Sequence, residues 1–134
     1  MYRVTRLIHF CYGHRLLEYA GKCRHPHGHN GKIEITLRKS KLDKLGFVMD
    51  FEEIKEKVQR WVDTELDHKM LLNRKDPLAK TLKDMGEPVV LMDGNPTAEN
   101  IARYIFDYAK GRKLPVVSVR LWETVNSHAD YVGD

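Results

Sequence analysis

Two stretches of this chain can form helices that are apolar on one side only, and they constrain the fold more than any other feature. The first stretch opens with Asp50 as a candidate N-cap and Glu53 three residues later, as in a capping box. Apolar residues then recur at helical spacing, namely Phe51, Ile54, Val58, Trp61, Val62 and Leu66. A helix of this kind needs an apolar surface to cover, so we expect it to lie on a sheet.

The second stretch begins at Asn95-Pro96-Thr97, where Pro and Thr are start signals for a helix. Its apolar face is formed by small and branched residues, namely Ala98, Ile101, Ala102, Ile105 and Ala109. Gly111 is expected to end this helix. The sequence therefore predicts two helices that cover the same sheet.

Four segments have the composition or the alternation of strands: residues 2–10, 29–39, 116–122 and 128–134. Residues 12–26 are expected to form an irregular loop. Residues 73–95 are polar and interrupted by Pro and Gly, and they fit a short helix at 78–85 and a strand at 89–92. This order predicts an α+β fold, an antiparallel sheet with helices on one face.

Length and charge limit the number of domains and the classes of ligand that we expect. With 134 residues, the chain is expected to form one domain, residues 1–134. No run approaches the roughly 18 apolar residues of a membrane span, and the N-terminus lacks the layout of a signal peptide, so we expect a cytoplasmic protein. The net charge of +4 suits an anionic substrate such as a phosphate ester, but the basic residues form no long stripe for nucleic acid.

Four of the seven histidines fall within sixteen residues, which points toward a metal site. His27-Gly28-His29 opens a predicted strand, and residues i and i+2 of a strand point to one face. His14 is the best-placed third ligand. Three imidazoles leave one position open, as in catalytic zinc sites. The alternative is a set of exposed or capping histidines, which His25 fits best.

Cys23 lies in the same segment and has two interpretations. It could be a fourth zinc ligand, which would make the site structural. It could instead be a free thiolate beside the open position, with Lys22, Arg24 and the dication lowering its pKa. The spacing does not decide between the two. Cys11 is expected to be a packed residue near the end of the first strand.

Three acidic positions are further candidates. Asp67 precedes His68 at a helix terminus, where it can orient the imidazole for proton transfer; the alternative is a surface histidine that favours the helix dipole. Glu123 ends an apolar strand beside Trp122 and could accept two N–H bonds from a purine or pterin, although a solvated strand end also fits. Glu99 lies in the first turn of the second helix, where acids are favoured.

Six short segments match a known family, in order and over nearly the whole chain: residues 10–16, 23–30, 49–51, 66–69, 95–100 and 122–124. The sequence resembles the 6-pyruvoyltetrahydropterin and 6-carboxytetrahydropterin synthase family. This resemblance implies the T-fold, or tunnelling fold, a four-stranded antiparallel sheet with two helices on one side. It also implies that subunits join into a barrel, commonly a homohexamer of two trimers with active sites between subunits.

The resemblance also implies roles for nine residues. They are the zinc ligands His14, His27 and His29, the proton acceptor Cys23, the proton relay Asp67 and His68, the pterin anchor Glu123, which also serves the relay, and the substrate-side residues Thr97 and Glu99. The implied cofactor is zinc. The implied partners are a pterin triphosphate substrate and further copies of the chain, without nucleic acid or membrane.

Three residues separate Cys23 from His27, as in the bacterial branch of the family. That branch implies a lyase that converts 7,8-dihydroneopterin triphosphate to 6-carboxy-5,6,7,8-tetrahydropterin for 7-deazaguanine and queuosine biosynthesis, with loss of acetaldehyde and triphosphate. The alternatives are a pyruvoyl-forming synthase and a non-catalytic pterin- or purine-binding protein with structural zinc. Two departures concern the substrate side: Gly13 replaces a usual Ala, and Gly31 stands where an aromatic residue often follows His-Gly-His-Asn.

Overall fold

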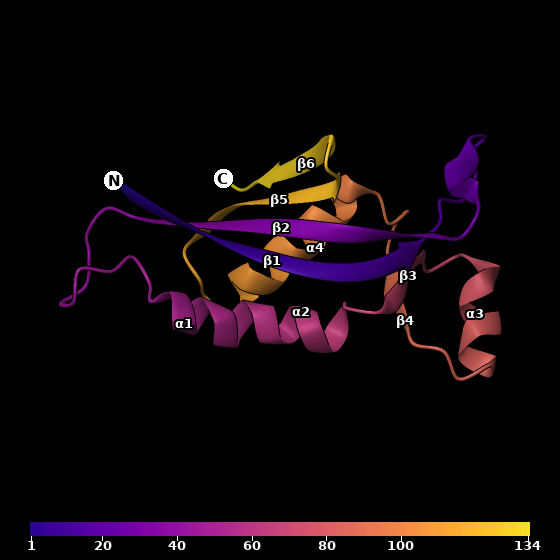
Figure 1. Ribbon diagram of the computed structural model, residues 1–134, viewed down its shortest axis with the longest axis horizontal. Coiled ribbons are helices and arrows are strands. Elements are labelled where there is room, and N and C mark those ends of the chain that lie inside the picture. Colours follow the sequence, from indigo (N-terminus) through magenta and orange to yellow (C-terminus); the bar gives the residue numbers. More distant parts are fainter.

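A long β-hairpin forms the centre of the computed structural model, which describes residues 1–134 (Figure 1). Strands β1 (Tyr2–His14) and β2 (His27–Lys39) pair antiparallel over their whole lengths, with Tyr2 opposite Lys39 and His14 opposite His27. The expectation that residues 12–14 belong to a loop was wrong. Their backbone pairs with residues 27–29, a long-range contact that local composition does not reveal.

Six strands form the sheet, in the order β4-β3-β1-β2-β5-β6. Strands β5 (Val116–Thr124) and β6 (Ser127–Val132) continue the hairpin antiparallel, so β1-β2-β5-β6 is the expected four-stranded unit. The expected strand count was too low, because β3 (Lys69–Asn73) and β4 (Val89–Met92) extend the β1 edge in parallel orientation. Parallel neighbours need crossover connections, which here contain the helices.

The helix predicted after Asp50 is one continuous element made of α1 (Phe51–Ile54), a π-helical turn η2 (Lys55–Gln59) and α2 (Arg60–Glu65). The Asp50 side chain accepts a hydrogen bond from the Glu52 amide at 2.9 Å, which confirms the N-cap. The reciprocal half of the capping box is absent, since Glu53 pairs with Lys57 instead, at 2.8 Å.

Three other helical segments complete the fold: η1 (Lys22–Arg24), α3 (Pro77–Asp84) and α4 (Ala98–Gly111). Helix α4 is the second predicted helix, and it ends at Gly111 as expected. Helix α3 is additional to the two helices of the expected fold and lies within residues 73–95, where a short helix had fitted the sequence. None of the helices is both long and apolar enough to cross a membrane.

The apolar core lies between one face of the sheet and the two long helices. Its wholly buried members include Ile33 and Ile35 from β2, Ile54 and Val58 from the first helix, and Ile101 and Ile105 from α4. The opposite face of the sheet is polar. It carries a hydrogen bond between the hydroxyls of Thr5 and Thr36 and an ion pair between Arg120 and Asp130. The expected alternation is therefore confirmed, with one face covered and one exposed.

Candidate metal centre

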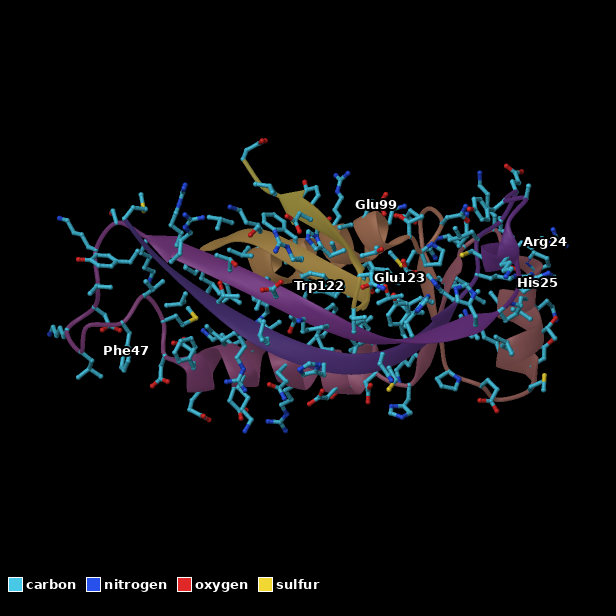
Figure 2. The ribbon with its side chains drawn as sticks, turned by 45° about the horizontal axis from the view of Figure 1, so that its top comes forward. Arg24, His25, Phe47, Glu99, Trp122 and Glu123 are labelled. Atoms are coloured by element: carbon cyan, nitrogen blue, oxygen red, sulfur yellow. The ribbon has the colours of Figure 1, made fainter.

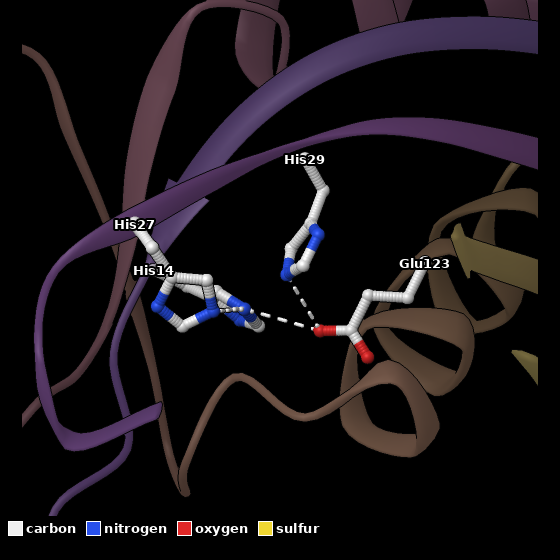
Figure 3. Close-up of side chains that lie close together, drawn as sticks. All are labelled: His14, His27, His29 and Glu123. Carbon is white, nitrogen blue, oxygen red and sulfur yellow. Dashed lines mark hydrogen bonds and ion pairs between the residues drawn. The ribbon is translucent and has the colours of Figure 1, made fainter. Parts of the chain in front are cut away.

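Three histidines meet at the end of the hairpin, on the face of the sheet that the helices cover (Figure 3). His14 ends β1 and lies directly opposite His27, and His29 follows two residues later on the same face of β2. The ligand atoms of these side chains and Glu123 all lie within 4.8 Å of one another, so this group could hold a metal ion. We call His14, His27, His29 and Glu123 the His/Glu group.

Backbone carbonyls fix the ring orientation of two of these histidines. The Nδ1 atom of His14 lies 2.7 Å from the carbonyl oxygen of Pro96, and Nδ1 of His27 lies 2.7 Å from that of His25. A carbonyl oxygen can only accept, so each Nδ1 carries a proton, and in the neutral ring Nε2 then presents its lone pair. Imidazoles that bind metal are commonly oriented in this way.

The arrangement of the Nε2 atoms fits a bound cation. Nε2 of His14 and Nε2 of His27 lie 3.0 Å apart, so two lone pairs face each other unless a cation lies between them. Two nitrogens on one tetrahedral zinc, each at about 2.0–2.1 Å, would lie about 3.3 Å apart. Nε2 of His29 is buried and has no partner with hydrogen-bond geometry, although Oε1 of Glu123 lies 3.0 Å away. These donors match the nitrogen ligands that zinc prefers.

Glu123 is the fourth member of the group. It comes from β5, beyond Trp122, and its Oε1 lies 3.1 Å from Nε2 of His14 and 3.0 Å from Nε2 of His29 (Figure 3). The contact with His14 lowers the pKa of this carboxyl against the effect of partial burial, and any positive charge on the three imidazoles acts in the same direction. The carboxylate is therefore ionised at neutral pH.

Burial favours the neutral forms of His29 and Tyr12. Desolvation lowers the pKa of His29 more than Glu123 raises it, which keeps the imidazole neutral, as a metal ligand must be. Burial and then the charge of Glu123 raise the pKa of Tyr12, so its phenol stays protonated. Tyr12 is 3% exposed, and its hydroxyl has no hydrogen-bond partner.

Of the two expected substrate-side residues, Glu99 lies beside Glu123. Glu99 is exposed in the first turn of α4 and lines a cavity of about 410 Å³ together with Glu123 and Ser127 (Figure 2). The hydroxyl of Thr97 is the N-cap of α4 and accepts a hydrogen bond from the Asn100 amide at 3.2 Å. The structure thus brings Glu99 close to the His/Glu group and gives Thr97 a structural contact.

Cys23 does not belong to the His/Glu group. It lies on η1 in the β1–β2 connection, next to Arg24 and His25, which Figure 2 labels at one end of the molecule. Its carbonyl oxygen accepts a hydrogen bond from the Leu16 amide at 2.8 Å, and the residue is half-buried. The fourth donor beside the three imidazoles is therefore a carboxylate.

Asp67 and His68 form the expected pair. Oδ2 of Asp67 lies 2.7 Å from Nδ1 of His68, and Oδ1 accepts the Cys11 amide at 2.8 Å. Burial alone would raise the pKa of Asp67, but the hydrogen bonds from Cys11 and His68 outweigh it and lower the pKa. His68, His27 and His29 line one cavity of about 740 Å³, so His68 adjoins two members of the His/Glu group.

Several contacts of this site were not predicted from the sequence. Cys11 was expected to be a packed residue, whereas its thiol donates to Oδ1 of Asn30 at 3.0 Å and the residue lines the cavity of about 740 Å³. Glu123 was expected to be the pterin anchor of the site, but its direct contact with the histidines was not predicted. The alternation of residues 119–123 was the available signal, because it puts Glu123 on the face of Val119 and Leu121, which the helices cover.

Comparisons with known proteins identify the family of this chain. The family model described as 6-pyruvoyl tetrahydropterin synthase matches residues 3–134. A protein of Rickettsia conorii named 6-carboxy-5,6,7,8-tetrahydropterin synthase is 37% identical over 133 residues, which cover 94% of this chain and 96% of that protein.

Two solved structures share the fold. The crystal structure of an uncharacterized protein from Wolinella succinogenes superposes with a TM-score of 0.85 at 25% identity, covering 99% of this chain and 98% of the other. The 6-pyruvoyl tetrahydropterin synthase of Caenorhabditis elegans gives a TM-score of 0.73 at 24% identity, with 99% and 96% covered. The expected T-fold is confirmed, and the chain belongs to the 6-pyruvoyl tetrahydropterin synthase family.

Proposed function

We propose that this protein is a zinc-dependent carbon–oxygen lyase. It converts 7,8-dihydroneopterin triphosphate and one water molecule to 6-carboxy-5,6,7,8-tetrahydropterin, acetaldehyde and triphosphate, in 7-deazaguanine and queuosine biosynthesis in the cytoplasm. The observation that carries the proposal is the His/Glu group, in which imidazole lone pairs converge beside an ionised carboxylate. The name of the Rickettsia conorii relative supports the carboxy-forming branch.

His14, His27 and His29 would hold the zinc ion, which when bound supplies Lewis acidity toward the hydroxyl groups of the substrate side chain. Glu123 would accept the N–H groups of the pterin ring edge. Its lowered pKa suits this role, because an ionised carboxylate accepts charge-assisted hydrogen bonds. Two further residues would contact the substrate. Glu99 lines the cavity of about 410 Å³ with Glu123, and Thr97 lies at the start of α4.

Cys23 would remove the proton from the side-chain carbon next to the ring. It follows His14 by nine residues and precedes His27 by four, so the segment that carries it is anchored at both ends by proposed zinc ligands. A second anchor is the ion pair of Arg15 with the buried Asp76, in which Arg15 Nε donates to Oδ2 at 2.8 Å. Positioning of this kind favours proton transfer over a short distance.

Asp67 and His68 would carry protons to and from the oxygens of the side chain. The 2.7 Å contact between Asp67 and His68 orients the imidazole, whose Nε2 is then left to exchange the proton. His68 has a positive φ of 61°, a conformation that non-glycine residues rarely adopt and that is often found at functional sites.

The proposed assembly is a homohexamer built from two trimers, with active sites between subunits. Strands β4 and β6 are the edges of the sheet and have unpaired backbone groups on their outer sides. Sheet edges of this kind are commonly covered in the native assembly, and joining subunits into a barrel would pair them. Light scattering coupled to gel filtration measures the number of subunits.

A product assay tests the function. Zinc-loaded protein is incubated with 7,8-dihydroneopterin triphosphate, and the products are identified by mass spectrometry. Acetaldehyde together with a carboxypterin is the expected result. A pyruvoyl product would identify the protein as a pyruvoyl-forming synthase instead. If neither product forms, the protein would be a non-catalytic binding protein.

The variant Cys23→Ala separates catalytic from structural zinc. We expect this variant to keep stoichiometric zinc and to lose turnover. Loss of zinc would make Cys23 a ligand and would contradict its proposed role as a base.

A further inference from the structure

The hydroxyl of Tyr12 is a buried polar group that the fold leaves without a partner. Tyr12 lies on β1 directly opposite His29 and two residues before His14, and only 3% of it is exposed. Buried hydroxyls in native proteins nearly always form hydrogen bonds, and an unpaired one weakens the fold. Because this hydroxyl lies beside the His/Glu group, we expect a bound ligand to supply its missing hydrogen-bond partner.

Packing holds the Tyr12 ring in place. It stacks on Phe10 with 4.9 Å between ring centroids, and its edge meets the ring of His14 at 5.2 Å. The ring also depends on Gly31, the residue opposite Phe10: a Cβ there would lie 3.0 Å from Cε1 of Tyr12 and 2.8 Å from the Phe10 ring. The absence of a side chain at Gly31 makes room for the phenol beside the imidazoles.

No acceptor of the protein reaches this hydroxyl. Oε1 of Glu123 is in contact with Nε2 of His14 and His29, and Glu123 forms no hydrogen bond with Tyr12. Tyr12 lines the cavity of about 740 Å³ together with His27 and His29. A molecule that enters this cavity with an oxygen or nitrogen acceptor would supply the missing partner.

We propose that Tyr12 is a substrate-positioning residue whose hydroxyl donates a hydrogen bond to an oxygen or nitrogen acceptor of the pterin bound at the His/Glu group. This inference rests on the proposed function, because it requires a pterin at this site. It assigns the hydroxyl to ligand binding and the ring to packing, and the two contributions can be measured apart.

The variant Tyr12→Phe removes the hydroxyl and keeps the ring that stacks on Phe10. In zinc-loaded protein we expect neopterin to bind about tenfold more weakly, as for loss of one hydrogen bond to a ligand. With the triphosphate substrate, KM should rise about tenfold while kcat changes little, the signature of lost uniform binding. The ligand-free variant should melt at the same temperature as the parent or higher, since an unpaired polar group is gone.

Tyr131→Phe is the matched control, because it removes a phenol hydroxyl from β6, where the ring packs on Phe106. Its neopterin affinity should equal that of the parent. The visible spectrum of Co²⁺-substituted protein reports the imidazole ligands independently and should be the same in all three proteins. Equal neopterin affinity in Tyr12→Phe and parent would overturn the inference alone. A parent that binds Co²⁺ but no pterin would overturn the proposed function and this inference with it.

Discussion

The two ends of the β1–β2 hairpin use one strand pattern for different purposes. At the apolar end, residues 2–8 and 33–39, the positions that face the helices include Ile8, Ile33 and Ile35, which are at most 1% exposed. At the polar end, residues 12–14 and 27–31, the same positions carry tyrosine, histidine and glycine. Alternation decides which side chains face the helices, and their chemistry decides whether they form core or site.

The two ends are also stabilised differently. The apolar end packs against the long helices, whereas the polar end is held by polar contacts to other segments. These are the Pro96 carbonyl on His14, the Asp67 carboxylate on the Cys11 amide, and the Asp76 carboxylate on Arg15 just beyond the strand. Apolar packing is insensitive to pH, while carboxylates are not. The predictions below test this contrast, from the largest expected effect to the smallest.

His14→Ala should remove function at the polar end and leave the apolar end folded. We expect loss of stoichiometric zinc and turnover at background level, because one of three nitrogen ligands and its contact with Pro96 are gone. Metal analysis and circular dichroism measure the two effects. His25→Ala is the matched control, since His25 touches the site through its carbonyl oxygen, which the variant keeps. Zinc retention in His14→Ala would contradict the metal site.

Ile35→Ala should have the reverse effect. Ile35 is wholly buried, so the truncation leaves a cavity and should lower the free energy of unfolding by about 2–5 kcal/mol. Denaturant unfolding measures the change. Ile35→Val removes one methylene and should cost about 0.5–1.5 kcal/mol. Folded Ile35→Ala should still bind zinc with the stoichiometry of the parent, and loss of zinc from the folded variant would show that the two ends are coupled.

Asp76 should make the polar end sensitive to acid. Its hydrogen bond with Arg15 lowers its pKa below the ordinary value of 3.8, against the effect of burial. A group with a lowered pKa contributes stability above its unfolded value, and that contribution is lost as the pH falls through the folded pKa. The free energy of unfolding of Asp76→Asn should therefore be lower than that of the parent by about 1.5–3 kcal/mol near neutral pH.

The acid titration of this variant gives the sharper test. Unfolding free energies of parent and Asp76→Asn should converge as the pH falls below 3.8, and a constant difference would contradict the ion-pair account. Asp93→Asn is the control, because Asp93 is 93% exposed and its pair with Arg74 should contribute less than about 1 kcal/mol.

Thr97→Ala should have the smallest effect. The Thr97 hydroxyl caps α4 through the Asn100 amide, and loss of such a cap costs about 1 kcal/mol. Thr97→Ser keeps the oxygen and should keep the stability. If pterin affinity falls in the alanine variant but not in the serine variant, the hydroxyl also serves the substrate, as the family resemblance implies. Equal affinity in both variants would limit Thr97 to its structural contact.

Local signals predicted the parts of this fold that depend on neighbours in sequence. Asp50, Thr97 and Gly111 mark helix ends in both sequence and structure, because caps act within one turn. The pair His27 and His29 was likewise readable, since two residues on one strand share a face whatever the strand pairs with.

Features that depend on pairing were not readable. The extension of β1 to His14 exists because residues 27–29 lie opposite, and β3 exists because the end of β1 offers a parallel partner. The approach of Glu123 to the histidines requires the register of β5 on β2, which no local pattern encodes. The contact between the Cys11 amide and Asp67 spans 56 positions and was missed for the same reason.

The hydrogen bond between His14 and the Pro96 carbonyl joins residues 82 positions apart. The orientation of His14 therefore depends on a residue that is synthesised much later. A ribosome exposes both strands of the hairpin long before it has made Pro96. Until then, nothing selects the tautomer of His14, and the nascent chain offers zinc a less organised set of imidazoles. Because long-range contacts form late, metal loading should follow release of the second half of the chain. Bound zinc would then mark molecules whose folding is finished.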